Sequence, residues 1–162
     1  MDVKFNTVEV FEIAEKIELN GSRFYRKAAE LFDEPGIRKT FLELADWEIT
    51  HEKVFADMRK QLSEQNRQPR TFEPEDDMAI SAQAMAGLAV FGINPDPSEE
   101  LTGKEDKKEI FEKALRKEED SIVYYVGLKD FVSEKAGKDR IDDIIREELR
   151  HIGILNQALQ WR

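Results

Sequence analysis

The stretch FLELADWEITHEKVF, at residues 41–55, places a glutamate and a histidine inside an otherwise apolar helical stripe. Apolar residues on both sides recur in alternating steps of four and three, which is the spacing of a buried seam in a helical bundle. Glu48 and His51 both fall on this seam, where core residues are expected. The complete seam is Ile37, Phe41, Leu44, Glu48, His51, Phe55, Met58 and Leu62.

A second motif of the same kind, ELRH at residues 148–151, lies on a matching seam near the end of the sequence. The chain contains two histidines, and each of them follows a seam glutamate by three residues. This repetition favours a shared role for the two motifs over two solvated surface pairs. The second seam is Ile141, Ile144, Glu148, His151, Leu155 and Ala158.

Two further seams each carry a lone glutamate and, two helical turns later, a tyrosine. Glu18 and Glu118 are 100 positions apart, and the same offset relates the two tyrosines and the two E-x-x-H motifs. A constant offset indicates an internal duplication of a helix pair. The seams are Phe11, Ala14, Glu18, Gly21, Tyr25, Ala28 and Phe32, and Phe111, Ala114, Glu118, Ser121, Tyr125, Leu128 and Val132.

The helical periodicity predicts an all-α, single-domain four-helix bundle over residues 1–162, built from two duplicated helix pairs. Pro35 fits the first turn of the second helix, and Thr102 and Glu105 have capping-box spacing at the start of the third. The pairs occupy residues 6–66 and 105–161, with helices ending near Phe32, Asn66, Ala136–Gly137 and Gln160.

A long crossover, residues 67–104, joins the two pairs and contains four of the five prolines. Its segment DMAISAQAMAGLAVF, residues 77–91, reads as a short alanine-rich helix. One interpretation is a connection whose helix packs on the bundle. The other is a contact surface for a homodimer, which we expect this protein to form. The apolar residues that would make that contact are Met78, Met85, Leu88 and Phe91.

The composition narrows the possible partners and the compartment. The net charge of -10 disfavours nucleic acid and anionic membranes, since both would be repelled. The absence of cysteine excludes disulfides, iron–sulfur clusters and thiol nucleophiles from this sequence. Neither a long apolar run nor a secretory signal pattern is present, so we expect a cytoplasmic protein.

Four glutamates at one level of an apolar core need compensating charge. Burying an ionised carboxylate without a partner costs several kcal/mol, and no lysine or arginine falls on the seams at that level. Two divalent cations would supply four positive charges, and carboxylate and imidazole ligands suit iron, manganese or zinc. The small residues Ala14, Gly21, Ala114 and Ser121 would leave room for them. The predicted metal ligands are Glu18, Glu48, His51, Glu118, Glu148 and His151.

Three more residues are candidates for supporting this site. Tyr25 and Tyr125 are either buried aromatics that find a hydrogen bond or groups that bond a ligand carboxylate or donate an electron. Glu147 is placed to reach across the bundle and orient a ligand histidine, His51. The corresponding residue of the first half is Trp47, which offers no acceptor.

A glutamate on each of two helices plus E-x-x-H on each of the other two resembles the ferritin-like di-iron carboxylate pattern. More narrowly, IELNGSRFYRKAAEL, FLELADWEITHEKVF and KEEDSIVYYVGLKDF resemble the rubrerythrin branch, in a stand-alone form without a rubredoxin domain. The resemblance covers the four long helices. It implies that Glu48 and Glu148 bridge two iron ions. Glu18 and His51 would complete the ligands of one ion. The other is completed by Glu118 and His151.

The resemblance also implies an activity, with two interpretations open. One is an oxidoreductase that oxidises ferrous iron with peroxide or dioxygen for detoxification, supplied by a separate electron-donor protein. The other is a protein that binds, stores or carries iron without catalytic turnover. Rubrerythrins typically have a further glutamate three residues after the ligand of the third helix, and here that position is Ser121.

Overall fold

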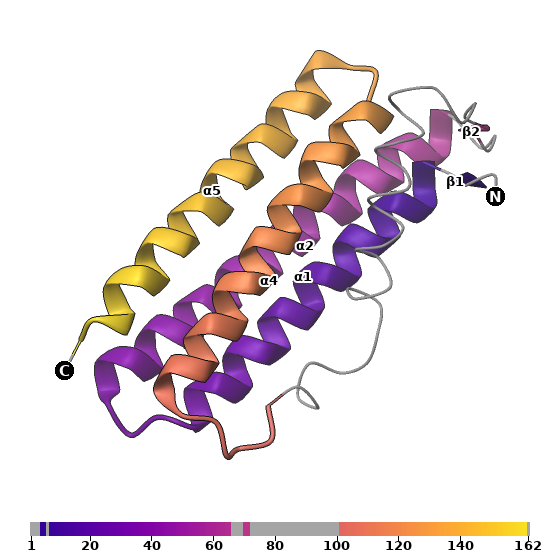
Figure 1. Cartoon of the computed structure of the whole chain (residues 1–162). Coiled ribbons are helices and arrows are strands. Elements are labelled where there is room, and N and C mark those ends of the chain that lie inside the picture. Colours follow the sequence, from indigo (N-terminus) through magenta and orange to yellow (C-terminus); the bar gives the residue numbers. More distant parts are fainter. Residues whose placement is uncertain (1–3, 6, 66–69, 72–100, 162) are drawn as a thin grey trace.

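The computed structural model describes residues 4–5, 7–65, 70–71 and 101–161. Its long helices are α1 (Thr7–Glu30), α2 (Pro35–Gln65), α4 (Lys107–Leu128) and α5 (Lys135–Leu159), with a 3-10 turn, η2 (Lys129–Phe131), after α4. They pack as two antiparallel hairpins, α1 with α2 and α4 with α5, which lie side by side (Figure 1). The predicted all-α four-helix bundle is therefore confirmed.

Two short strands lie at one end of the bundle. Strand β1 (Lys4–Phe5) pairs with β2 (Arg70–Thr71) in antiparallel register, with Lys4 opposite Thr71. The predicted helix at residues 77–91 and the proposed dimer contact lie outside the described residues. Within the described part of the chain, none of the helices has the length and apolar character needed to cross a membrane.

The first hairpin follows the predicted bounds closely. Helix α2 begins at Pro35, whose missing N–H costs nothing in the first turn, where no intrahelical partner is available. The Arg38 amide donates to the Glu34 carbonyl at 3.0 Å and closes that turn. Helix α1 ends at Glu30, two residues before the predicted end at Phe32. Phe32 is nevertheless buried, so the seam continues past the last helical residue.

The predicted start of the third helix was a few residues early. The capping box of α4 is made by Asp106 and Glu109, whose side chains and backbone amides bond each other at 2.8 Å in both directions. Glu105 instead accepts from the Thr102 amide at 2.7 Å and the Gly103 amide at 2.9 Å. Gly103 has a φ of +83°, so this turn requires a glycine. The Thr102–Glu105 spacing therefore marks a tight turn that precedes the helix.

The predicted boundary between the third and fourth helices, near Ala136–Gly137, was also wrong. Helix α4 ends at Leu128, and Ala136 and Gly137 lie inside α5. The chain reverses at Val132, which is extended, with φ of -110° and ψ of 120°. A Cβ on Gly137 would lie 2.5 Å from Val132 Cγ1. Gly137 is thus explained by the close approach of the reversing chain, and it does not end a helix.

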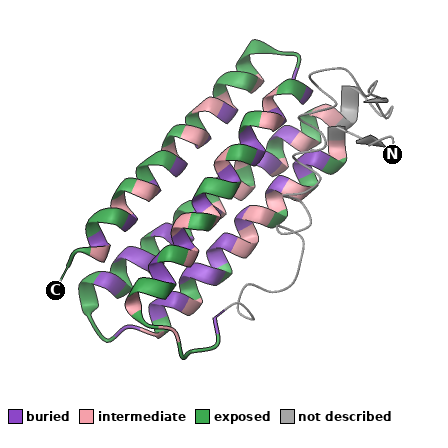
Figure 2. Cartoon of the chain, viewed as in Figure 1, coloured by how far each residue is buried: buried purple, intermediate pink, exposed green. Residues whose placement is uncertain are grey.

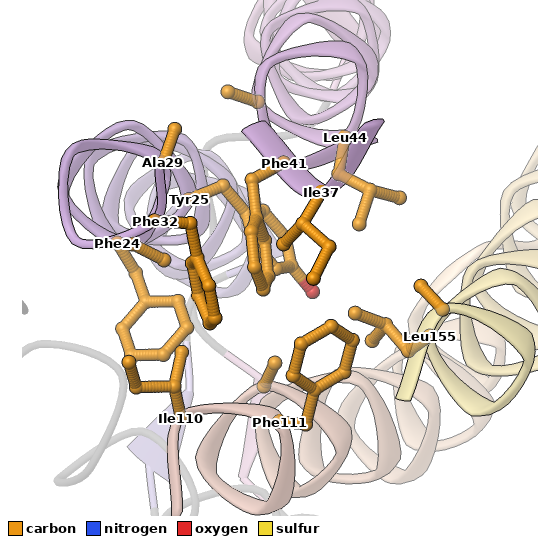
Figure 3. Packing of buried hydrophobic residues seen from close by; sticks show 14 of the residues in the cluster. Phe24, Tyr25, Ala29, Phe32, Ile37, Phe41, Leu44, Ile110, Phe111 and Leu155 are labelled. Carbon is orange, nitrogen blue, oxygen red and sulfur yellow. The ribbon is translucent and has the colours of Figure 1, made fainter. Parts of the chain in front are cut away.

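Apolar residues form two clusters, one towards each end of the bundle. The first includes Phe11, Phe55 and Tyr125. The second contains Phe41 and Phe111, whose ring centroids are 5.1 Å apart, with Tyr25 and Leu155 close to them (Figure 3). Buried residues follow the inner faces of all four helices (Figure 2). The level between the two clusters holds the seam glutamates and histidines.

Candidate metal centre

All six predicted ligands are in the interior. Their exposed fractions are at most 3%, although each is a polar or ionisable residue. Each helix contributes its glutamate at the same level, and α2 and α5 also contribute the histidine one turn later. The residues are Glu18, Glu48, His51, Glu118, Glu148 and His151.

These side chains form two overlapping groups. One comprises Glu18, Glu48, His51 and Glu148, and the other replaces Glu18 and His51 by Glu118 and His151. Within each group, one oxygen or nitrogen from every residue lies within 4.8 Å of the others. Glu48 and Glu148 belong to both groups, which is the arrangement expected for two ions that share two carboxylates.

The hydrogen-bond inventory of the cluster tests whether ions fit there. Both oxygens of Glu148, one oxygen of each other glutamate and the Nδ1 atom of each histidine are buried without a hydrogen-bond partner. Leaving such atoms unpaired is costly in a protein interior. No lysine or arginine is among the buried residues of the described chain. The unpaired atoms are all metal-ligating types, so the residues present fit a pair of divalent cations.

Both histidines point Nδ1 into the cluster. For His51, Nδ1 lies 2.6 Å from Glu148 Oε1 and 3.5 Å from Glu18 Oε2. For His151, Nδ1 lies 3.4 Å from Glu48 Oε1 and 3.5 Å from Glu118 Oε1. The two rings are stacked, with centroids 5.6 Å apart. Each histidine therefore directs a nitrogen towards carboxylates from both helix pairs.

Without metal, this crowding changes the acidity of the cluster. Burial raises the pKa of Glu48, and the neighbouring Glu18 raises it further. Burial and the charge of Glu118 raise the pKa of Glu148 to about 8. The metal-free cluster therefore retains protons that metal ions would displace.

The pKa values of both histidines are raised, so the histidines also retain protons in the metal-free cluster. Burial by itself lowers the pKa of His51, but its contacts with Glu148 and Glu18 outweigh burial and raise the pKa to about 11. The same balance raises the pKa of His151 to about 9, through Glu118 and Glu148. Protonated imidazoles thus supply part of the positive charge that the carboxylates require.

The two tyrosines connect the helix pairs crosswise. Tyr25 on α1 donates its hydroxyl hydrogen to Glu118 Oε1 on α4, and Tyr125 on α4 donates to Glu18 Oε1 on α1. In both glutamates the second oxygen, Oε2, has no hydrogen-bond partner. Each tyrosine therefore fixes one carboxylate oxygen and leaves the other one free to bind a cation.

The surroundings of the two histidines differ. His51 Nε2 lies 2.5 Å from Glu147 Oε2, whose side chain is about one-third exposed. Because an ionised carboxylate only accepts, the imidazole donates this bond. The indole ring of Trp47 lies 6.5 Å from the His51 ring and 6.4 Å from the His151 ring. Glu147 thus reaches across the bundle to His51, while the corresponding residue of the first half covers the histidine pair.

Some contacts of the site were not anticipated from the sequence. Trp47 lacks an acceptor, but its position one turn before His51 places both residues on one helix face, which is the signal for their contact. Tyr124 donates to the Val10 carbonyl at 2.8 Å, beside Tyr125. The Ser121 hydroxyl donates to the Lys117 carbonyl of its own helix at 2.8 Å, as a helical serine often does.

Comparisons with known proteins agree with this geometry. The Rubrerythrin family model matches residues 9–84, which include Glu18, Glu48 and His51. A crystal structure described as a ferritin-like diiron-carboxylate protein from Thermotoga maritima aligns with a TM-score of 0.73 and 28% sequence identity. The alignment covers 96% of this chain and 95% of that one.

Together, the family-model match and the structural alignment support the ferritin-like/rubrerythrin superfamily for this chain. A search of curated proteins finds no match. The superfamily has di-metal sites that are typically occupied by iron, and the buried cluster of carboxylates and histidines suits such a site. The features that decide the assignment are the bundle, its two E-x-x-H motifs and the two lone glutamates.

Proposed function

We propose that this protein binds two iron ions in the bundle core and oxidises ferrous iron with peroxide or dioxygen, as a detoxifying oxidoreductase. The observation that supports it most is the pair of four-residue groups that share Glu48 and Glu148. Their unpartnered ligand atoms support it as well. A single-ion site would not need the second glutamate–histidine set.

Each of the six ligand residues has a defined role in this proposal. Glu48 and Glu148 would contact both ions, Glu18 and His51 would complete one position, and Glu118 and His151 the other. When bound, a pair of ferrous ions supplies the two electrons that reduce a peroxide bond. Carboxylates suit this chemistry because they change between one-atom and two-atom binding as the charge of the site changes.

The protein itself controls water and protons around the site. The apolar clusters on both sides, with Phe55 and Phe111 fully buried, exclude bulk solvent from the cluster. Burial and nearby carboxylates hold the pKa values of Tyr25 and Tyr125 well above the usual value for a phenol. Both phenols therefore keep their protons and continue to donate to Glu118 and Glu18.

Repeated turnover needs a source of electrons. The sequence contains no cysteine, so it offers no thiolate ligands for a second iron site of the rubredoxin kind. We propose that a separate reductant or donor protein returns the oxidised ions to the ferrous state.

The test begins with anaerobic loading of ferrous iron, followed by peroxide with and without excess reductant. Repeated peroxide consumption at about two irons per chain is the expected result. Uptake far beyond two irons per chain would instead support storage, and tight binding without oxidation would support carriage. Either result would contradict the oxidoreductase assignment.

Variants of the shared glutamates make this test specific. Glu48→Ala and Glu148→Ala should each lose most bound iron, because each removes a ligand common to both positions. Glu43→Ala is the matched control, since Glu43 is an exposed glutamate on the same helix as Glu48. Metal content per chain, measured after dialysis, reports the result. Equal and negligible losses at Glu48 and Glu148 would contradict the shared-ligand assignment.

A further inference from the structure

The duplicated halves are not equivalent around the ligand histidines. His51 Nε2 lies 2.5 Å from Glu147 Oε2, so this imidazole is held by a carboxylate on the side away from the cluster. The residue related to Glu147 by the duplication is Trp47, whose indole has no acceptor. Among the described residues, no hydrogen-bond acceptor is paired with His151 Nε2. Both histidines direct Nδ1 into the cluster, but only His51 also has a carboxylate partner at Nε2 among the described residues.

We propose that the two metal positions differ in affinity, with the Glu18/His51 position the tighter one and Glu147 the positioning residue responsible. The inference rests on the proposed di-metal function and assigns different roles to its two halves. The Glu18/His51 position keeps its ion, and the Glu118/His151 position exchanges its ion with solution.

The physical reason is the effect of Glu147 on the imidazole. A carboxylate that accepts from Nε2–H fixes the tautomer in which Nδ1 is the free ligand atom. It also fixes the orientation of the ring and makes Nδ1 a stronger donor to a cation. Nδ1 of His51 already faces Glu148 and Glu18, so no rotation of the ring is needed when an ion binds.

His151 lacks this support. Its ring is packed by His51 at 5.6 Å and by Trp47 at 6.4 Å, and both contacts are between ring faces or edges that do not select a tautomer. When an ion binds at this position, the imidazole must first adopt the tautomer with the proton on Nε2 and a free Nδ1. The free energy of that step weakens binding.

The test uses backgrounds that isolate each position. His151→Ala leaves the Glu18/His51 position, and His51→Ala leaves the Glu118/His151 position. Anaerobic cobalt(II) is the probe, and its affinity is measured by calorimetry and by the visible absorption of the bound ion. Glu147→Ala is then added to each background, which makes a double-mutant cycle.

The expected result is specific to one background. Glu147→Ala should lower cobalt affinity about ten- to a hundredfold in the His151→Ala chain and leave it unchanged in the His51→Ala chain. Glu147→Gln keeps an acceptor oxygen and should lose less. Asp143→Asn, an exposed acid one turn away that pairs with Arg146, is the charge-matched control and should have no effect.

Two outcomes would overturn the inference. One is an equal loss in both backgrounds, which would mean that Glu147 acts through general charge. The other is no loss in the His151→Ala chain. A wild-type protein that binds no cobalt would instead contradict the proposed function itself, so the two failures are distinguishable.

Discussion

Gly21 on α1 faces the carboxylate of Glu48 on α2 so closely that a Cβ on Gly21 would lie 2.5 Å from Glu48 Oε2. The same Cβ would lie 3.1 Å from Cδ and 3.4 Å from Cγ of Glu48. The glycine is in the middle of a helix, where it is unfavourable by about 0.8–1.0 kcal/mol relative to alanine. Its presence is therefore explained by the position of the Glu48 carboxylate.

The Gly21→Ala variant should separate metal binding from stability. The added methyl group displaces the end of the Glu48 side chain, so metal affinity should fall about tenfold or more. Helix propensity favours alanine, so the free energy of unfolding without metal should change by less than about 1 kcal/mol. Gly153→Ala is the control, because a Cβ there meets nothing within 4 Å. A Gly21→Ala protein that binds metal normally would show that the carboxylate adapts without loss.

Removing the Tyr25 hydroxyl should destabilise the metal-free protein. Burial by itself raises the pKa of Glu118, but its contacts with Glu148 and His151 outweigh burial and lower it, so Tyr25 donates to a charged group. Such bonds contribute about 1.5–3 kcal/mol, against about 0.5–1.5 kcal/mol for a neutral acceptor. Tyr25→Phe should therefore cost more unfolding free energy in urea than Tyr124→Phe, which loses a bond to the Val10 carbonyl. Equal costs would argue against a charged Glu118.

The stability of the metal-free protein should fall as the pH rises from about 5 to 9. The pKa of Glu148 is raised from 4.5 to about 8, so ionising it costs more in the folded chain than in the unfolded chain. The raised pKa values of His151, about 9, and His51, about 11, act in the same direction above pH 6.5. Thermal melting at several pH values measures this slope.

Bound metal should reverse this pH dependence, so that stabilisation by metal increases as the pH rises. Cations replace the protons on Glu148 and the histidines, so they bind more tightly as the pH rises. The increase in melting temperature on adding zinc should therefore be larger at pH 8 than at pH 6. A zinc effect that is independent of pH would contradict the displacement of protons from the cluster.

Trp47 should report metal binding by its fluorescence. Its ring centroid lies within 6.5 Å of both histidine rings, so ions with partly filled d shells, such as cobalt(II), should quench it. Zinc, with a filled shell, should quench much less. The chain has one other tryptophan, Trp161, beyond the end of α5. Trp161→Phe should keep the cobalt response and Trp47→Phe should lose it. The opposite pattern would place the ions elsewhere.

Most of the bundle was predictable because the seam spacing is regular. Every position of the four seams from Phe11 to Ala158 is buried, except Leu62, which is partly exposed. Glu48 and His51 were recognisable because polar residues interrupt an apolar pattern, and the offset of 100 related them to Glu148 and His151. Periodicity thus identifies which side chains share a level before any contact is known.

The turns were less predictable because their signals have more than one physical meaning. Gly137 looked like a helix stop, yet it accommodates Val132 from inside a helix. The Thr102–Glu105 spacing looked like a helix cap, yet Asp106 and Glu109 form the cap. These outcomes depend on packing between segments, which spacing alone does not contain.

The crosswise bonds from Tyr25 to Glu118 and from Tyr125 to Glu18 mean that neither hairpin is self-sufficient. Each candidate metal position also draws glutamates from both hairpins. Ions held there would link the two hairpins, so that separating the hairpins would also release the metal. We therefore expect release of bound ions to require the two halves to move apart, while the four helices keep their own backbone hydrogen bonds.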